Sequence, residues 1–363
     1  MAGVDGDVLV IGAGLAGCLA ALALRDQGLA VTMVAPPQRA VASYCSYGGV
    51  PGWAVLPGRF GEAMLRAPES WRALEQRHGP LGWQPCAVSL HWSEAEAEAA
   101  GPLVERLQAQ VPVARRQPQR LILPFGRVDG LRLAQALPLA LERCGIRRRQ
   151  DTVASLERLS PQGWRLNLAG GEPLEAPRVL LAAGPASAGL WPALAQCRPP
   201  AVGMSWSGAL ALEAGACAPQ DLPAGAAEGI VIPLLGQRQA LEGRCSRLER
   251  PEWIVDAGLA PHGDGWWLGQ ITVVAPAGAA CPAPDPIWME AELRRQLRAV
   301  WPRLADLPGR LAVVPVGFPG AEGPLCGAVD GAPGLWGWTG IPSSFALLPV
   351  LAPGLASAMA GTL

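Results

Sequence analysis

The pattern of apolar and polar positions predicts a mixed α/β chain that opens with a strand, a helix and a second strand. Residues 8–11 are all apolar and lead into a glycine-rich turn. An alanine- and leucine-rich stretch follows to Gln27, where Gly28 is typical of a helix stop. Residues 29–34 form another apolar run. The whole stretch has the size of one βαβ unit, whose second strand returns parallel to the first.

The later elements are mixed rather than strictly alternating. Between Leu131 and Arg143 the apolar residues fall on one helical face, and Gly145 marks a stop. Residues 152–156 and 163–168 predict a hairpin across Ser160, Pro161 and Gln162. We also expect strands at 178–183 and 264–274, a helix at 288–303, and Pro- and Gly-rich loops at 276–286 and 316–330.

The composition predicts a folded protein with a neutral surface. The chain has 363 residues, 50% of them hydrophobic, which is enough for one large α/β body or two interleaved domains. Only 16% are charged, and 29 basic residues nearly cancel 30 acidic ones, so we expect no nucleic-acid partner. Every basic residue apart from the histidines is arginine, which excludes lysine chemistry.

The cysteines and the N-terminus favour a cytoplasmic protein. The nine cysteines are scattered, odd in number and never arranged as CxxC, so we expect reduced thiols and no metal site. The apolar N-terminal stretch carries Asp5 and Asp7, has no basic residue at its start and is interrupted by glycines. It is therefore predicted to be neither a signal peptide nor a stable membrane span.

The strongest chemical motif is GAGLAG at residues 12–17, directly after a predicted strand and at the mouth of a predicted helix. Gly12 permits the tight turn, Gly14 lets the backbone approach a pyrophosphate, and Gly17 allows close helix packing. Leu15 and Ala16 complete the helix start, whose N-terminus favours negative charge. The second strand leads to Ala35, where such sites usually have an acidic residue for the ribose, so that contact is missing or moved.

Several segments together resemble the family of FAD enzymes that includes D-amino-acid oxidase, glycine oxidase and sarcosine oxidase. They are VLVIGAGLAG, ASYCSYGGV at 42–50, GRVDGLRLAQALPLALERCGI at 126–146, RVLLAAG at 178–184, the strand at 265–272, and the C-terminal GLWGWTGIPSSFALLPVLAPGLASAMAG. The resemblance implies noncovalent FAD as the cofactor. It also implies an α/β fold, in which a Rossmann-type FAD-binding domain is interleaved with a mixed, largely antiparallel β-sheet substrate domain.

The resemblance also implies domain boundaries and site residues. The FAD-binding domain would comprise 1–80, 125–190 and 320–363, and the substrate or cap domain 81–124 and 191–319. Val153 would lie beside the adenine and Gly184 beside the dinucleotide. The flavin and its ribityl chain would contact Ser43, Ser46, Gly48 and Gly49. At the flavin's pyrimidine end, the start of the last helix would present Thr339, Gly340, Ser343 and Ser344, and its positive end would stabilise negative charge on the reduced flavin.

The sequence departs from this family at the substrate site. Val316 falls near the position of the arginine that holds the substrate carboxylate in the amino-acid oxidases. Arg238, Arg244, Arg247 and Arg250 are alternative anchors or ordinary solvated residues. The family clamp is often completed by tyrosine, but the only tyrosines are Tyr44 and Tyr47, both in the flavin loop.

These observations predict an FAD-dependent oxidoreductase that removes hydride from a carbon next to nitrogen. The electron acceptor is oxygen or another molecule, because the lysine that activates oxygen in sarcosine-type oxidases is missing. Fourteen tryptophans suit a bulky or aromatic small-molecule substrate, with Trp336 and Trp338 as candidate pocket walls, although core packing explains a tryptophan equally well. The alternatives are a flavoprotein with a decayed or partner-dependent substrate site and, less consistent with the VDGAPG segment at 329–334, a flavin monooxygenase.

Overall fold

A computed structural model describes residues 6–37, 41–159, 163–191, 202–279, 281–320 and 323–361. The chain forms two compact units, and each is discontinuous in sequence. Unit 1 comprises 1–41, 137–204 and 316–363, and unit 2 comprises 42–136 and 205–315. The predicted domains were defined by expected function, whereas these two units are defined by compactness. The predicted domain boundaries therefore stay a prediction.

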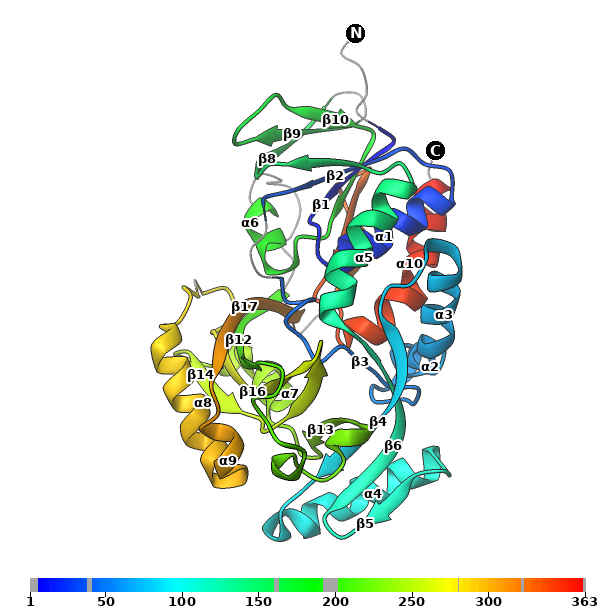
Figure 1. The fold of residues 1–363 in the computed structure, drawn as a ribbon. Coiled ribbons are helices and arrows are strands. Elements are labelled where there is room, and N and C mark those ends of the chain that lie inside the picture. Colours follow the sequence, from blue (N-terminus) through cyan, green and yellow to red (C-terminus); the bar gives the residue numbers. More distant parts are fainter. Residues whose placement is uncertain are drawn as a thin grey trace. The chain divides into compact units, whose positions relative to one another are not determined.

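Unit 1 is built on a six-stranded sheet (Figure 1). Five of its strands are parallel, because β1 pairs with β11 and β2, β11 pairs with β19, and β2 pairs with β7. Only the edge strand β18 is antiparallel to its neighbour. In spatial order the strands are β18 (Leu325–Ala328), β19 (Leu335–Thr339), β11 (Arg178–Leu181), β1 (Val8–Ile11), β2 (Val31–Ala35) and β7 (Arg147–Gln150).

Both faces of this sheet are covered. A three-stranded antiparallel sheet, β8 (Val153–Arg158), β9 (Trp164–Leu168) and β10 (Leu174–Ala176), forms a buried cluster with the alternate residues Leu9, Ile11, Val179 and Leu181. Helix α1 (Leu15–Asp26) contacts β1, β2 and β19 and packs against α10 (Ser344–Ala360). This is the layered arrangement of a doubly wound α/β domain, with the three-stranded sheet as one outer layer.

Unit 2 is built on a ten-stranded, largely antiparallel sheet, with a parallel pair formed by β4 and β13. In spatial order the main path is β17 (Gly309–Pro319), β12 (Val202–Leu212), β16 (Gly265–Val274), β15 (Leu259–His262), β13 (Gly229–Pro233), β4 (Trp83–His91), β6 (Arg120–Val128) and β3 (Gly49–Val50). Beside this path, β14 (Glu252–Val255) pairs with β16, and β5 (Arg115–Gln117) pairs with β6. The predicted fold class, a Rossmann-type domain interleaved with a mixed and largely antiparallel sheet, is confirmed.

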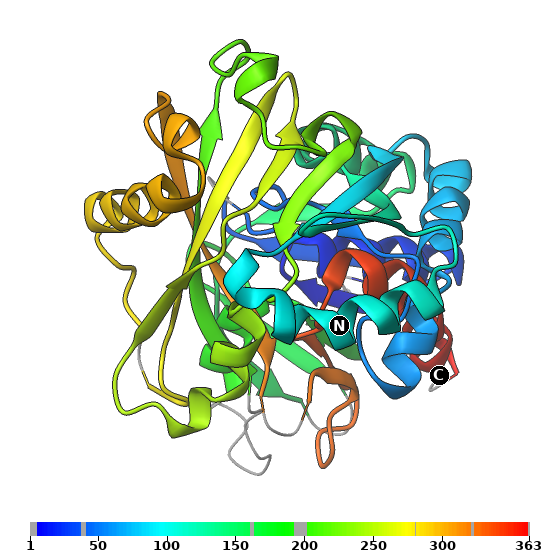
Figure 2. The ribbon, with the colours of Figure 1, turned by 90° about the horizontal axis from the view of Figure 1, so that it is seen from below.

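Helices cover parts of the unit 2 sheet. Helix α8 (Pro286–Val300) lies beside the sheet in Figure 2, where it is gold, and its buried residues Met289, Leu293 and Leu297 form one cluster with Leu268 and Ile271 of β16. The other α-helices in the described part of the chain are α2 (Gly58–Met64), α3 (Ala67–His78), α4 (Ala97–Gln110), α5 (Gly130–Arg143), α6 (Ser187–Leu190), α7 (Arg238–Gly243) and α9 (Pro302–Ala305).

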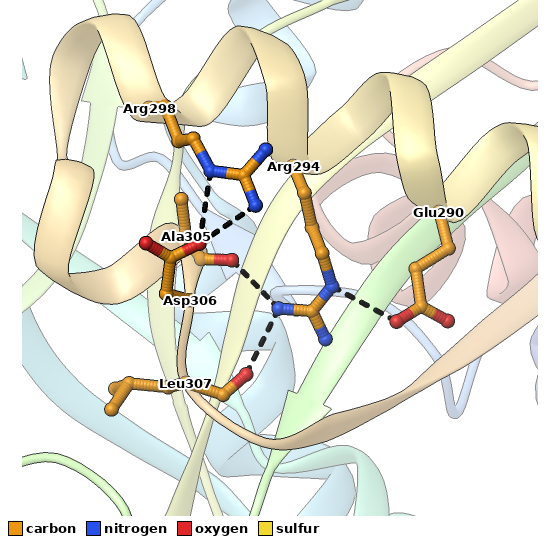
Figure 3. Close-up of polar contacts among 6 residues, drawn as sticks. All are labelled: Glu290, Arg294, Arg298, Ala305, Asp306 and Leu307. Carbon is orange, nitrogen blue, oxygen red and sulfur yellow. Dashed lines mark hydrogen bonds and ion pairs between the residues drawn. The ribbon is translucent and has the colours of Figure 1, made fainter.

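Arg294 fixes the turn from α8 into α9 (Figure 3). Its Nη1 donates to the carbonyl oxygens of Ala305 at 2.7 Å and Leu307 at 2.9 Å, and its Nε donates to Glu290 at 2.9 Å. Ala305 is the last residue of α9 and Leu307 lies two residues beyond it, so both carbonyls are at or just after a helix end, where the helix itself supplies no donor. One guanidinium thus connects α8 to the chain that leads into β17.

Most of the predicted elements are present, with two differences. The expected helix at 288–303 divides into α8 and α9, because Trp301 precedes a proline and has non-helical backbone angles, φ of −134° and ψ of 74°. The loop expected at 316–330 is wrong in part, since it contains the end of β17 and all of β18. Both are edge strands, where missing donors and glycines are tolerated. The turn expected at Ser160, Pro161 and Gln162 lies outside the described residues.

Candidate functional site

The candidate cofactor site begins with the turn after β1, which is packed too closely for any side chain. Gly12 has φ of +111°, and a Cβ atom built on it would lie 2.4 Å from the carbonyl oxygen of Ala182 after β11. On the other side, the Gly12 N–H donates to Val34 of β2 at 2.9 Å. The turn is therefore held directly against the backbones of both neighbouring strands, and glycine is required at its first position.

Helix α1 then starts directly on this turn. A Cβ atom on Gly17 would lie 2.1 Å from the carbonyl oxygen of Gly12. Gly14 is the N-cap and makes no side-chain hydrogen bond to the helix, and the first turn contains no acidic residue. Leu15 is buried and Ala16 is partly exposed in the same turn. The first turn of α1 thus carries no negative charge of its own, and the positive end of this helix suits a phosphate group.

Two further strands of unit 1 end at the same edge of the sheet. Because β1, β11 and β19 are parallel, Gly184 after β11 and Gly340 after β19 lie at the carboxyl edge together with Gly12. Thr339 is buried, and its Oγ1 donates to the Gly184 carbonyl at 2.9 Å. Ligands of open α/β sheets bind outside this edge. The structure therefore brings together the predicted residues of three separate segments.

The start of α10 has an unusual backbone. Ser343 has φ of +44°, a left-handed conformation that is uncommon for residues other than glycine. Its carbonyl accepts from Ala346 at 2.8 Å and Leu347 at 3.1 Å, and the Ser344 hydroxyl donates to Ile341 at 2.8 Å. This helix start again has no side-chain cap and no acidic residue in its first turn. Its geometry suits the stabilisation of negative charge, as the sequence predicted.

The segment that was predicted to contact the adenine of the cofactor lies at the edge of the sheet beside β2. The Asp151 N–H donates to Ala35 at 3.0 Å, so the segment that leads to Val153 begins next to the end of β2. The sequence identified Ala35 as a missing acid but did not indicate that Asp151 lies beside it. The Asp151 carboxylate already accepts from the N–H groups of Thr152 at 2.8 Å and Gly170 at 3.1 Å. It therefore holds its own loop in place.

The remaining predicted cofactor residues lie in unit 2, in the loop at 42–50. Gly49 pairs with Arg127 in the β3–β6 ladder, and a Cβ atom on Gly48 would lie 2.0 Å from the carbonyl oxygen of Val128. The Ser46 hydroxyl accepts from the Gly48 N–H at 3.2 Å, and Ser43 is half-buried. Glycine at position 48 thus lets the loop lie directly on the end of β6.

The residues at the edge of the unit 1 sheet fit a dinucleotide. A turn with no space for a Cβ atom and an uncapped helix end without acidic residues form a backbone cradle for a pyrophosphate. Among the described residues, no group of three histidine, cysteine or acidic side chains is placed to hold a metal ion. No helix in the described parts of the chain is long and apolar enough to cross a membrane.

The predicted substrate residues lie in different places. Trp336 and Trp338 point to the same side of β19 and are 7% and 0% exposed, and their assignment as pocket walls stays a prediction. Val316 lies in β17. Of the four alternative arginines, Arg238 and Arg244 form ion pairs with Glu242 and Glu252, while Arg247 and Arg250 are exposed.

Unit 2 also contains a buried ion pair that the sequence did not reveal. The Arg127 Nη2 lies 3.3 Å from Asp129 Oδ2, and the two side chains are 8% and 4% exposed. Asp129 also accepts from the N–H groups of Leu131 and Arg132, at 3.0 and 3.1 Å, and so caps α5. Neither Arg127 nor Asp129 was predicted from the sequence to have this role.

Comparisons with known proteins agree with this geometry. A protein-family model described as FAD dependent oxidoreductase, DAO, matches residues 7–360. A search of curated protein sequences found no match. Three solved structures are similar in fold. L-amino acid deaminase from Proteus vulgaris is 17% identical with a TM-score of 0.67, covering 99% of this chain and 92% of that chain.

The other two structures are equally distant in sequence. Glycine oxidase from Geobacillus kaustophilus is 15% identical with a TM-score of 0.70, covering 98% of this chain and 94% of that chain. L-α-glycerophosphate oxidase from Mycoplasma pneumoniae, with FAD bound, is 14% identical with a TM-score of 0.71, covering 99% and 94%. The family match over nearly the whole sequence is the decisive finding, and the chain belongs to the DAO family of FAD-dependent oxidoreductases.

Proposed function

We propose that this enzyme oxidises a carbon–nitrogen bond of a small amine or amino-acid-like molecule. The observation that carries the proposal is the carboxyl edge of the unit 1 sheet, where two uncapped helix ends, α1 and α10, meet the requirements of an FAD site. When bound, FAD supplies the acceptor for a hydride from the substrate carbon. L-amino acid deaminase and glycine oxidase, which share the fold, are named for amino-acid substrates.

In this proposal the chain's own residues hold the cofactor and favour its reduction. Gly12, Gly14 and Gly17, with the amides around Leu15 and Ala16, hold the pyrophosphate, and Val153 lies beside the adenine. The loop at 42–50 contacts the flavin and ribityl chain through Ser43, Ser46, Gly48 and Gly49. Gly184 lies beside the dinucleotide, and the segment from Thr339 through Gly340 to Ser343 and Ser344 directs the positive end of α10 at the flavin.

We do not expect the substrate to carry the free carboxylate of an amino acid. The family resemblance puts Val316 near the position of the carboxylate-binding arginine, and Arg238 and Arg244 are paired with glutamates. A buried carboxylate without a cation is costly. We therefore favour an amine with a bulky or aromatic group over a simple amino acid. We also place the enzyme in the cytoplasm, since its described cysteines are all free thiols.

The test is an anaerobic substrate screen on the purified protein. Glycine, iminodiacetate, phenylalanine, phenylalaninamide and N-methylbenzylamine are added in turn while the yellow absorbance of oxidised flavin is recorded. We expect at least one aromatic amine to bleach the flavin, and glycine to be slow. Readmitting oxygen then distinguishes an oxidase, which recovers its colour quickly, from a dehydrogenase that needs another acceptor.

The second candidate is a flavoprotein whose substrate site has decayed or depends on a partner. Val316 and the missing acidic residue at Ala35 are the observations that favour it. It predicts a yellow protein that no member of the screen bleaches, while the artificial reductant dithionite bleaches it normally. Bleaching by any of the amines would exclude this candidate.

A further inference from the structure

Tyr47 has a position in unit 2 that the cofactor site does not explain. It is the middle residue of the turn closed by the Ser46 hydroxyl and the Gly48 N–H, so its backbone is fixed. Its ring lies over Gly258, between β14 and β15. A Cβ atom built on Gly258 would lie 2.8 Å from Cε2 and 2.9 Å from Oη of Tyr47. The absence of a side chain at Gly258 therefore makes room for this phenol.

The phenol lies at the border of an aromatic cluster. Tyr47 packs against the buried cluster that contains Trp53 and Trp267. Trp53 contacts Phe125 with ring centroids 5.3 Å apart, and Trp267 stacks on His262 at 4.3 Å. Trp53 and Trp267 are buried, whereas Phe125 and His262 are partly exposed, so the exposed ring surface of this cluster belongs to Phe125 and His262. Aromatic rings of this kind line small-molecule sites for bulky or aromatic groups.

Two donors in this environment have no acceptor. Within the part of the chain that the structure describes, neither the Tyr47 hydroxyl nor the Trp267 Nε1–H has a hydrogen-bond partner, although both atoms are buried. Leaving a buried polar group unpaired is costly, so such groups are normally paired. An acceptor from outside the protein chain would satisfy the phenol.

The local charge determines which acceptor is suitable. Burial raises the pKa of the Tyr47 hydroxyl, and the negative charge of Asp256 raises it further, so the phenol stays a neutral donor. Asp256 is held in place by the N–H groups of Gln237 and Arg238, at 2.9 and 3.2 Å. Because a carboxylate acceptor would be repelled by Asp256, an uncharged oxygen is favoured.

We propose that the Tyr47 hydroxyl, held over Gly258, donates a hydrogen bond to an uncharged carbonyl oxygen of the substrate, whose apolar group packs on the neighbouring rings. The inference rests on the proposed function and narrows it: the substrate is an amide, ester or similar neutral carbonyl compound with an amine, rather than a free amino acid. Tyr47 is then a specificity-determining residue, and Gly258 is the position that makes room for it.

The chain has only two tyrosines, which makes the phenol directly observable. Protein loaded with FAD and labelled with carbon-13 at the tyrosine ring gives two resonances, and the Tyr44→Phe variant assigns them. The probes are benzamide, which offers a ring and a neutral carbonyl, and benzoate, its charged analogue. We expect the shift of the Tyr47 resonance to saturate as the benzamide concentration rises. The same shift should require an about tenfold higher concentration of benzoate.

Variants give a second readout that does not need turnover. In Tyr47→Phe, the benzamide concentration that half-saturates the change in flavin absorbance should rise about tenfold, while the FAD content stays the same. Gly258→Ala should weaken benzamide similarly by displacing the ring, and Tyr44→Phe should not. A Tyr47 resonance that benzamide leaves unmoved, or benzoate binding at least as tightly as benzamide, would overturn the proposal. If no amine bleaches the flavin but benzamide shifts Tyr47, the proposed function fails, and with it the identity of the substrate, while the binding of a neutral carbonyl oxygen by Tyr47 is upheld.

Discussion

At the scale of single residues, the cofactor site depends on positions where only hydrogen fits. Gly17 is the clearest, because its Cβ atom would overlap the Gly12 carbonyl oxygen at 2.1 Å, and both atoms belong to fixed backbone. A side chain there must separate α1 from the turn after β1. The distance between the helix end and the pyrophosphate would then change.

Gly17→Ala is therefore expected to abolish FAD retention. The purified variant should be colourless, or bind added FAD at least about tenfold more weakly, as measured by quenching of flavin fluorescence. Gly101→Ala is the matched control, since Gly101 lies in α4 with nothing within 4 Å of its Cβ position. A Gly17→Ala variant that keeps its full FAD content would contradict the assigned role of the turn.

Asp129 gives a stability prediction with a defined pH dependence. Burial alone would raise its pKa, but the Arg132 N–H and the Arg127 charge outweigh burial, and the net pKa is lowered. A carboxyl whose pKa is lowered on folding stabilises the protein above its unfolded pKa, near 3.9, and this stabilisation is lost as the pH falls through the folded pKa.

Asp129→Asn should retain part of the cap but leave Arg127 buried without its countercharge. We expect the free energy of unfolding to fall by about 3 kcal/mol at neutral pH, with a smaller loss on acidification than in the wild type. Chemical denaturation at several pH values measures both effects. Asp285→Asn is the control, because Asp285 caps α8 at the exposed surface and should change stability by less than about 0.5 kcal/mol. Equal effects of the two substitutions would refute the role of the buried pair.

The sequence reveals these residues unequally. The glycines were recognisable because strand, turn and helix follow one another within a short segment. Neither the partner of Asp129 nor the closeness of Tyr47 to Gly258 was predictable. Gly258 is more than two hundred residues from Tyr47, so the contact depends on how strands pair, and no local pattern records it.

At the scale of elements, the local periodicity of apolar residues predicted the strands and helices that pack against elements close to them in the sequence. The first strand, helix and second strand, the β8–β9 hairpin and β16 are of this kind. The strands β4 and β6 were not predicted, because Pro85 and Pro124 interrupt their patterns. Sheet pairing with distant partners overrides these local signals.

The α8–α9 turn tests an element-scale interaction. Arg294→Ala removes the donor for the Ala305 and Leu307 carbonyls (Figure 3) and should lower the free energy of unfolding by about 2 kcal/mol. Arg295→Ala on the same helix is the control, since the Arg295 side chain is 62% exposed and its ion pair is with Glu292, three residues earlier on that helix. Urea denaturation compares the two variants. The assigned role of Arg294 would be untenable if the control were destabilised equally.

At the scale of the whole molecule, the order of the strands in the sheet could not be predicted from the periodicity of apolar and polar residues. The six-stranded sheet places β11, from the middle of the chain, beside β1, and β19, from the end of the chain, beside β11. Only the resemblance of separated segments to one family implied that they meet. The two-unit organisation and the FAD-dependent family follow from that resemblance and are supported by the fold and by the family match.

The central claim is that this edge of the sheet holds FAD, and the visible spectrum of the purified protein tests it most directly. The protein should be yellow, and denaturation should release FAD, without a covalent link, in an amount equal to that of the chain. A colourless protein that takes up no FAD when the cofactor is supplied in excess would contradict the account.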